Sequence, residues 1–229
     1  MNSTKNNLQV LFEDNHIIII NKRVGDIVQG DKTGDTPLSE IVKQYIAKKY
    51  QKKGNVFLGV VHRLDRPTSG IVIFARTSKA LERLNKMLRD KQLQKIYWAI
   101  VKNKPTREKD TLIHYLKKNP KNNKSTVFAR ETEGSKKAIL HYTILKELDN
   151  YFVLKIDLET GRHHQIRAQL SFIKSPIKGD LKYGFNRSNP DGGISLHARE
   201  IQFIHPVSKE VIHIVADTPN TSIWNSCST

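Results

Sequence analysis

The chain is organised around Val60-Val61-His62-Arg63-Leu64-Asp65-Arg66-Pro67-Thr68-Ser69-Gly70, which the apolar run Ile71-Val72-Ile73-Phe74-Ala75 follows directly. Apolar residues on both sides of a proline and a Ser-Gly pair are typical of a strand, a loop and a second strand. Pro67 also favours an extended conformation at Arg66. The sequence therefore predicts that the polar residues of this stretch lie in a loop at the edge of a core.

Asp65 stands between two arginines and close to a histidine. Neighbouring cations favour the ionised carboxylate and restrict its orientation, which suits a nucleophile or a base. Ion pairs of this kind also fix loops without any chemical role, because charged networks are common at structural positions. The residues of the loop leave both interpretations open.

A second polar segment is Thr160-Gly161-Arg162-His163-His164-Gln165-Ile166-Arg167, which follows the alternating strand pattern of residues 152–158. Its isoleucine, with Leu170 and Ile173, has the spacing that buries one side of a helix, so the cations lie near the helix start. Unpaired N–H groups at a helix start, together with cations, favour an anion. An exposed surface position for the last arginine is the structural alternative.

Both segments resemble signatures of the RluA-type family of RNA pseudouridine synthases. The first match is His62-Arg63-Leu64-Asp65 with Thr68-Ser69-Gly70, and the second is the segment from Thr160 to Arg167. Further similar segments, in the expected order, extend the resemblance from about Leu11 to about Pro219: they are Pro176 to Asp180, Tyr183-Gly184, Leu196 to Arg199 and His205-Pro206. Most residues of these further segments are expected to be structural.

The resemblance implies an α+β pseudouridine synthase fold, which is a largely antiparallel mixed sheet with flanking helices and a central RNA-binding cleft. The cleft is expected between the loop of Asp65 and the helix start at residues 162–167. We expect a single catalytic domain over residues 1–229, with its core at about 9–219 and short polar tails. We expect the chain to lack the small RNA-binding domain that many relatives carry ahead of this one.

The resemblance also assigns the active site. Asp65 is the essential catalytic residue, Arg167 pairs with it, and Tyr97 stacks on the uracil. By alternation, Tyr97 faces away from Ile96 and Trp98, although a strand tyrosine that only packs is the alternative. The substrate-binding residues that it implies are Lys22, His62, Arg63, Arg162, His164 and Gln165.

The implied reaction is an isomerisation of uridine in RNA, and it requires neither metal nor cofactor. Adjacent histidines at 163 and 164 lack a third ligand at metal-binding spacing. Cys227 is the only cysteine, so an intrachain disulfide is excluded and a cytoplasmic location is expected. Attack by Asp65 on the nucleotide and removal of a ribose proton both remain open.

The charge of the chain points to a polyanionic partner. There are 39 lysines and arginines against 22 acidic residues among 229, a formal net charge of +17. No basic amphipathic anchor, signal peptide or membrane-spanning run is apparent, so RNA, ribosomal or transfer, is favoured over a membrane. We expect a monomer without an obligatory protein partner. A catalytically silent RNA-binding module and a metal-independent RNA hydrolase are the competing functions.

Three local features carry further expectations. Residues 9–13 and 16–22 flank Asp14-Asn15 in a hairpin pattern. Lysines 48, 49, 52 and 53 follow a helical stripe and precede Gly54, so they either complement the helix end, with Gly54 as a left-handed cap, or contact phosphates. The basic segment 116–124 is expected to be a mobile loop, either solvated or reaching for phosphates.

Three positions depart from the family pattern: Arg23 replaces a usual proline, and Gln169 and Ser175 replace frequent histidines. We expect these departures to affect only a local turn and the choice of substrate.

Overall fold

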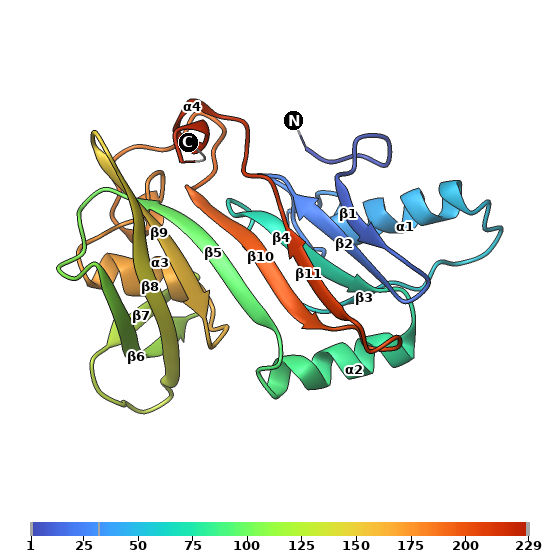
Figure 1. The fold of residues 1–229 in the computed structure, drawn as a ribbon, viewed down its shortest axis with the longest axis horizontal. Helices are drawn as coiled ribbons and strands as arrows, with labels where there is room; N and C mark the ends of the chain where they lie inside the picture. Colours follow the sequence, from blue (N-terminus) through green and yellow to red (C-terminus); the bar gives the residue numbers. More distant parts are fainter. Residues whose placement is uncertain (1, 32, 228–229) are drawn as a thin grey trace. The chain divides into compact units, whose positions relative to one another are not determined.

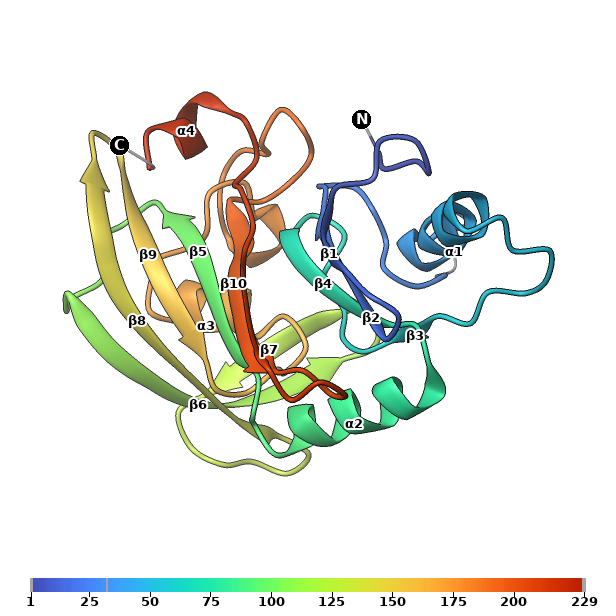
Figure 2. The same cartoon turned by 45° about the vertical axis from the view of Figure 1, so that its right-hand side comes forward.

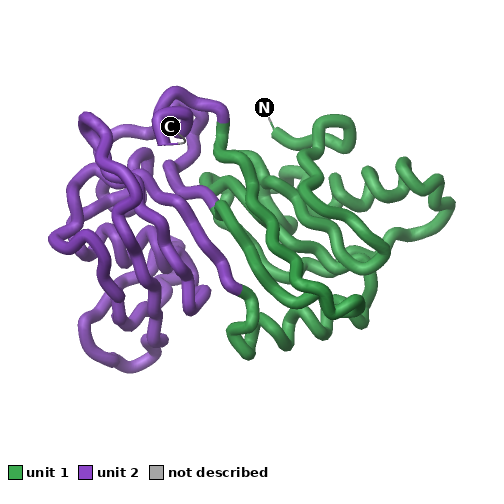
Figure 3. Tube along the Cα trace, viewed as in Figure 1, with its two compact units in different colours: residues 1–93, 198–219 green, residues 94–197, 220–229 purple. Residues whose placement is uncertain are grey.

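The computed structural model describes residues 2–31 and 33–227. The chain forms two compact units: unit 1 contains residues 1–93 and 198–219, and unit 2 contains residues 94–197 and 220–229 (Figure 3). Strands and helices occur in both units (Figure 1). Within the described ranges, no helix is long and apolar enough to cross a membrane. The single domain over residues 1–229 stays a prediction.

Unit 1 is built on strands that pair in the order β1, β2, β4 and β10, with β11 on β10 and β3 on β4. The pairings β1–β2, β2–β4, β3–β4 and β10–β11 are antiparallel. Their bounds are β1 (Val10–Glu13), β2 (Ile17–Lys22), β3 (Gly59–Val60), β4 (Ser69–Ala75), β10 (Leu196–Ile204) and β11 (Val211–Val215). The expected strand–loop–strand pattern around Asp65 is thus formed by β3 and β4.

Helix α1 (Leu38–Lys49) packs on this sheet, and α2 (Ser78–Arg89) packs against β3 and β4 (Figure 2). Every residue of β2 and β4 is buried, because both strands lie in the interior of the unit. The buried residues that α1 and the strands share are Ile18, Ile20, Val28, Leu38, Val42, Ile46, Val72 and Phe74. This cluster anchors the strand ends that lead to Lys22 and Asp65.

The end of α1 differs from the prediction at Gly54. Gln51 adopts the left-handed conformation, with φ of 49°. The Lys52 N–H donates to the Ala47 carbonyl at 3.0 Å, and the Gln51 N–H donates to the Lys48 carbonyl at 3.4 Å. This is the Schellman pattern, which satisfies the last helical carbonyls with backbone donors. Proximity of a glycine in the sequence was therefore a misleading cue.

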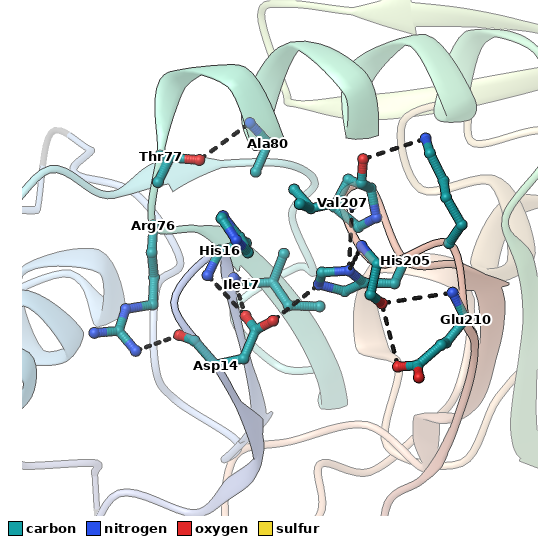
Figure 4. A network of polar contacts seen from close by, with 12 residues as sticks. Asp14, His16, Ile17, Arg76, Thr77, Ala80, His205, Val207 and Glu210 are labelled. Atoms are coloured by element: carbon teal, nitrogen blue, oxygen red, sulfur yellow. Dashed lines mark hydrogen bonds and ion pairs between the residues drawn. The ribbon is translucent and has the colours of Figure 1, made fainter.

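The turn between β1 and β2 lies where the hairpin pattern predicts it, and Asp14 fixes it. Its Oδ1 accepts hydrogen bonds from the N–H groups of His16 (2.8 Å) and Ile17 (2.7 Å). Figure 4 shows Oδ2 directed at Nε2 of His205, 3.0 Å away. The other ring nitrogen of His205 accepts from the N–H of Val207 at 3.2 Å. The β1–β2 turn is therefore held to the turn that follows β10.

Unit 2 contains a sheet with the antiparallel order β5, β9, β8, β6 and β7. Helix α3 (Gln165–Phe172) packs on β6 and β7, next to a short 3-10 helix η1 (Leu181–Tyr183), and α4 (Ser222–Asn225) lies near the C-terminal end. The strand bounds are β5 (Gln94–Val101), β6 (Lys109–Asn119), β7 (Lys124–Phe128), β8 (Lys136–Leu148) and β9 (Tyr151–Leu158). The expected α+β class with a largely antiparallel sheet is confirmed.

The basic segment 116–124 is not the expected long loop. Residues 116–119 belong to β6, and β7 starts at Lys124, so only residues 120–123 form the turn of a hairpin. The backbone pairs Lys117 with Thr126 and Asn119 with Lys124. The prediction was wrong because exposed, polar strand residues carry no apolar alternation from which a strand can be inferred.

Candidate active site

The loop of Asp65 occupies residues 61–68 between β3 and β4 of unit 1. The Thr68 N–H donates to the Asp65 carbonyl at 3.0 Å, which closes a turn at the catalytic candidate. Leu64 packs against the core cluster that α1 shares with β2 and β4. The Asp65 side chain is half-buried, whereas Arg63 is exposed. The loop is thus anchored on one side of Asp65 by apolar packing and on the other by a backbone turn.

Gly70 sets the start of β4 behind this loop. Its φ is +111°, and a Cβ atom there would lie 2.4 Å from the Ala198 carbonyl oxygen. Only glycine fits, because an L side chain would be strained and would collide with the neighbouring backbone. The Ser-Gly pair of the motif therefore has a packing reason as well as a turn reason.

Lys22 lies at the end of β2 with only 1% of its surface exposed. Its Nζ donates to the carbonyls of Arg23 at 2.8 Å and Arg66 at 3.2 Å. Burial lowers the pKa of Lys22 to about 7, although the carboxylates of Asp26 and Asp65 partly oppose that shift. Direct contact between Lys22 and RNA stays a prediction. The burial of Lys22 favours an indirect role, in which its bond to the Arg66 carbonyl positions the loop of Asp65.

Lys22 also supports a pH-dependent prediction. Its pKa is about 7 in the folded chain against an ordinary value of 10.5 for a lysine in the unfolded chain, so the unfolded chain binds more protons between these two pH values. By linkage, Lys22 makes the folded state less stable below pH 7, and this penalty declines as the pH rises, by up to about 1.4 kcal/mol per pH unit. Lys22→Met should remove this dependence.

The measurement is urea unfolding of the wild type and Lys22→Met at a series of pH values from about 6 to 9. The difference in the free energy of unfolding between the two should change with pH only above about pH 7. Lys79→Met, at an exposed position on α2, is the matched control and should show no such trend. A difference that is constant over the whole series would contradict the depressed pKa.

His62 and Arg66 tie the loop to its surroundings in unit 1. Nε2 of His62 accepts a hydrogen bond from the N–H of Ile73 in β4 at 3.2 Å. Nη2 of Arg66 contacts the Asp35 carboxylate at 2.6 Å and the hydroxyl of Thr33 at 2.8 Å. These contacts hold the loop, and Arg63 is the expected RNA-binding residue of this unit that is exposed.

Arg167 of α3 is buried, with 5% of its surface exposed, so a surface position is excluded. Its Nε and Nη2 donate to the two oxygens of Asp180 at 2.7 and 2.9 Å. The guanidinium carbon also lies 5.2 Å from the centre of the Tyr183 ring. The paired fork geometry is the strong form of an arginine–carboxylate interaction. Sequence reasoning missed Asp180 as the partner of Arg167, because it expected most residues of the segment from Pro176 to Asp180 to be structural.

His164 precedes α3 in the left-handed conformation, with φ of 53°. Its Nδ1 lies 3.0 Å from the hydroxyl of Tyr183, and its ring stacks on His163 at 3.8 Å between centroids. The Tyr183 hydroxyl also accepts from the Ser125 N–H at 2.8 Å. Tyr183, whose ring lies under the Arg167 guanidinium, therefore connects the start of α3 to β7.

Gln165 and Arg162 connect the same helix start to β8. The Gln165 Nε2 donates to the Ile139 carbonyl at 3.0 Å, and its Oε1 accepts from the Arg162 N–H at 3.0 Å and the Thr160 hydroxyl at 2.8 Å. Nε of Arg162 donates to the Lys137 carbonyl at 2.9 Å, while its side chain stays exposed. The buried Gln165 thus fixes the start of α3 to β8, and Arg162 is accessible to a ligand.

Tyr97 lies on β5, paired with Ile156 of β9, and 7% of its surface is exposed. Asp65 belongs to unit 1, whereas Tyr97 and Arg167 belong to unit 2. The meeting of these three side chains, and the cleft around them, stay predictions. No group of three or more histidine, cysteine, aspartate or glutamate side chains suited to a metal occurs in the ranges 2–31 and 33–227.

Two of the departures from the family pattern are core residues. Gln169 is fully buried, and its Nε2 donates to the Leu112 carbonyl at 3.2 Å and contacts Nδ1 of His114 at 3.0 Å. Ser175 is also fully buried. Their influence on substrate choice stays a prediction.

The model of the family described as RNA pseudouridylate synthase matches residues 16–172, which include both motif segments. The chain belongs to the RNA pseudouridylate synthase family. The resemblance to RluA-type synthases, drawn from the segments around Asp65 and Arg167, is thereby confirmed. RNA pseudouridine synthases are isomerases, and RNA is the substrate that the family name implies.

Relatives of this pseudouridylate synthase chain are similar to it in sequence over nearly its whole length. An uncharacterized RNA pseudouridine synthase of Synechocystis is 32% identical over 217 residues, which are 93% of this chain and 66% of the relative. The ribosomal large subunit pseudouridine synthase C of Buchnera aphidicola is 34% identical over 219 residues, 92% of this chain and 67% of that protein. The chain thus spans about two thirds of the length of these curated relatives.

Among solved structures, the human RNA pseudouridylate synthase domain containing 4 is similar in fold. It superposes with a TM-score of 0.79 at 21% sequence identity and covers 94% of this chain and 90% of its own. The expected pseudouridine synthase fold is confirmed by this likeness, which at such identity concerns the fold alone.

Proposed function

We propose that this chain is an RNA pseudouridine synthase that isomerises particular uridines in structured RNA, ribosomal or transfer. The family match over residues 16–172, which contains both the loop of Asp65 and the whole of α3, is the observation that carries the proposal. The formal charge of +17 supports an RNA substrate, since lysine and arginine side chains neutralise phosphates and release their counterions.

The reaction breaks the bond between ribose C1′ and uracil N1, turns the bound base, and forms a bond between C1′ and C5. N1 gains a proton and C5 loses one, so the composition and the length of the RNA do not change. No oxidant or reductant takes part. The target base must leave the helical stack before any protein group can reach it, which costs unstacking energy and requires a pocket for the base.

Asp65 supplies the ionised carboxylate, which attacks the nucleotide or removes a ribose proton. Its half-buried position on an anchored turn supports this role, because a reactive group needs both access and a fixed orientation. Arg167 favours the charged form of Asp65, and Asp180 keeps the guanidinium in one orientation. Tyr97 stacks on the uracil and accepts the proton from C5. Arg63 holds a phosphate or takes the place of the flipped base.

The test is to incubate the purified protein with ribosomal and transfer RNA transcripts and to map pseudouridine by carbodiimide modification. We expect modified uridines at discrete positions in RNA of unchanged length. Shortened RNA would instead indicate a hydrolase, and RNA that is bound but unmodified in every transcript would indicate a binding module.

A further inference from the structure

Exposed lysines gather at the C-terminal end of α1 in unit 1. We call this the α1-end surface, and it comprises Lys5, Lys48, Lys49, Lys52 and Lys53. A hollow of about 380 Å³ lies within it, lined by three of these lysines together with Asn6 and Tyr45. The proposed chemistry at Asp65 uses none of these residues.

An ordered turn at the start of the chain carries Lys5 and contacts Lys48. The Asn7 N–H donates to the Thr4 carbonyl at 3.2 Å, and the Thr4 N–H donates to Oδ1 of Asn7 at 2.6 Å. This turn brings Asn6 to α1, where Nζ of Lys48 donates to its Oδ1 at 3.3 Å. The hollow is thus preformed, which reduces the entropy that a ligand must overcome.

The acidic side chain next to this surface is already neutralised. Glu13 contacts Nζ of Lys49 at 2.6 Å and Nη1 of Arg76 at 3.1 Å. The hydrogen bond to Glu13 raises the pKa of Lys49, so this lysine stays charged. Among the lysines of the α1-end surface, Lys5, Lys48, Lys52 and Lys53 form no ion pair with a carboxylate of residues 2–31 or 33–227. The surface therefore carries an excess of positive charge.

Helix capping does not account for these lysines. The last carbonyls of α1 receive backbone hydrogen bonds from Gln51 and Lys52 in the Schellman pattern, while the side chains of Lys48 and Lys49 bond to Asn6 and Glu13. A favourable interaction with the helix dipole remains, but it is small for exposed groups and screened by salt. Lys5 and Lys48 line the hollow without a carboxylate partner, and Lys52 and Lys53 add charge at the adjoining helix end, so the surface fits a polyanion better.

We propose that the α1-end surface binds the phosphate backbone of the RNA substrate, at a distance from the reacting uridine; this inference rests on the proposed function. The start of α1 adjoins the catalytic loop, since the Leu38 N–H donates to the Ile27 carbonyl at 2.7 Å and the Gly25 N–H to the Arg66 carbonyl at 3.0 Å. A helix of 12 residues is about 18 Å long, so the surface contacts nucleotides that flank the target.

The test compares two variants that lose the same charge from exposed helical or helix-end positions of unit 1. The surface variant is Lys48→Gln, Lys52→Gln and Lys53→Gln. The control variant, on α2, is Lys79→Gln, Lys86→Gln and Arg89→Gln. Affinity for a fluorescein-labelled RNA hairpin is measured over a series of salt concentrations. The negative slope of log affinity against log salt should become shallower by about 2 to 3 in the surface variant, and by less than about 1 in the control.

Equal slopes in the surface variant and the wild type would overturn the proposal, and a lowered melting temperature with an unchanged slope would assign the lysines to the helix dipole alone. If the surface variant lost the binding to phosphatidylglycerol vesicles that the wild type shows, while its RNA binding stayed intact, the surface would belong to a lipid partner. That result would overturn the proposal as well. Because binding is read without turnover, a flattened slope supports the surface even if the wild type forms no pseudouridine. If the surface variant formed pseudouridine normally and kept the salt slope of the wild type, the proposed surface would be wrong, whereas the proposed function would be unaffected.

Discussion

Asp65→Asn should make pseudouridine formation undetectable while the chain stays folded and binds RNA about as tightly as the wild type. The amide keeps the shape of the carboxylate but lacks the charge that a nucleophile or base needs. The local turn should survive, because the Thr68 N–H bonds to the backbone carbonyl of Asp65 and not to its side chain. Carbodiimide mapping, thermal unfolding and RNA affinity, measured on the same preparation, give the three readouts.

The matched control is Asp35→Asn, which changes another carboxylate beside the same loop. Asp35 contacts Arg66 at 2.6 Å, and its side chain is 56% exposed. A surface ion pair of this kind contributes about 0 to 1 kcal/mol, so activity per folded molecule should stay near that of the wild type. If Asp65 only fixed the loop, both variants would retain activity in proportion to folded protein, and that outcome would end its assignment as the catalytic residue.

Asp180→Ala should lower the free energy of unfolding by about 3 kcal/mol or more, because it removes the bidentate partner of a buried guanidinium. Both side chains are almost fully buried, at 6% exposure for Arg167 and 1% for Asp180, so water cannot replace the lost contacts without rearrangement. For a chain of 229 residues this corresponds to a melting temperature about 10 °C lower. Thermal and urea unfolding measure the effect.

A compensating variant separates stability from chemistry. Replacing the pair by Arg167→Met with Asp180→Leu removes both buried charges, and such replacements are often neutral or stabilising. We expect this double variant to recover most of the stability and none of the pseudouridine formation. Glu147→Ala in the exposed pair with Lys104, at 3.1 Å, is the control and should cost less than about 1 kcal/mol. A loss for Asp180→Ala no larger than this control would contradict the structural role of the pair.

Local patterns in the sequence predicted much of the fold. The isoleucines of β2 and the run at Ile71 to Ala75 are apolar because both strands are buried on both faces. The stripe of α1 follows helical spacing because one face packs on these strands. Such signals lie within one element, so single-sequence reasoning can detect them.

The features that sequence reasoning missed depend on tertiary contacts. Asp180 meets Arg167 from thirteen positions further along the chain, through a loop whose path no local spacing encodes. Gln51 adopts the left-handed cap although Gly54 is nearby, because the position of the helix end decides which residue takes that conformation. The side chains of Gln165 and Lys22 bond to backbone carbonyls, which the motif letters do not reveal.

The central claim is that this chain moves the glycosidic bond of uridine from N1 to C5, and the most direct test is the fate of the hydrogen on C5. RNA transcribed with uridine that carries tritium at C5 is incubated with the wild type and with Asp65→Asn, and the tritium released into water is counted against RNA length. We predict release by the wild type alone, with the RNA intact. No release by the wild type from ribosomal or transfer RNA, or equal release by both proteins, would contradict the account.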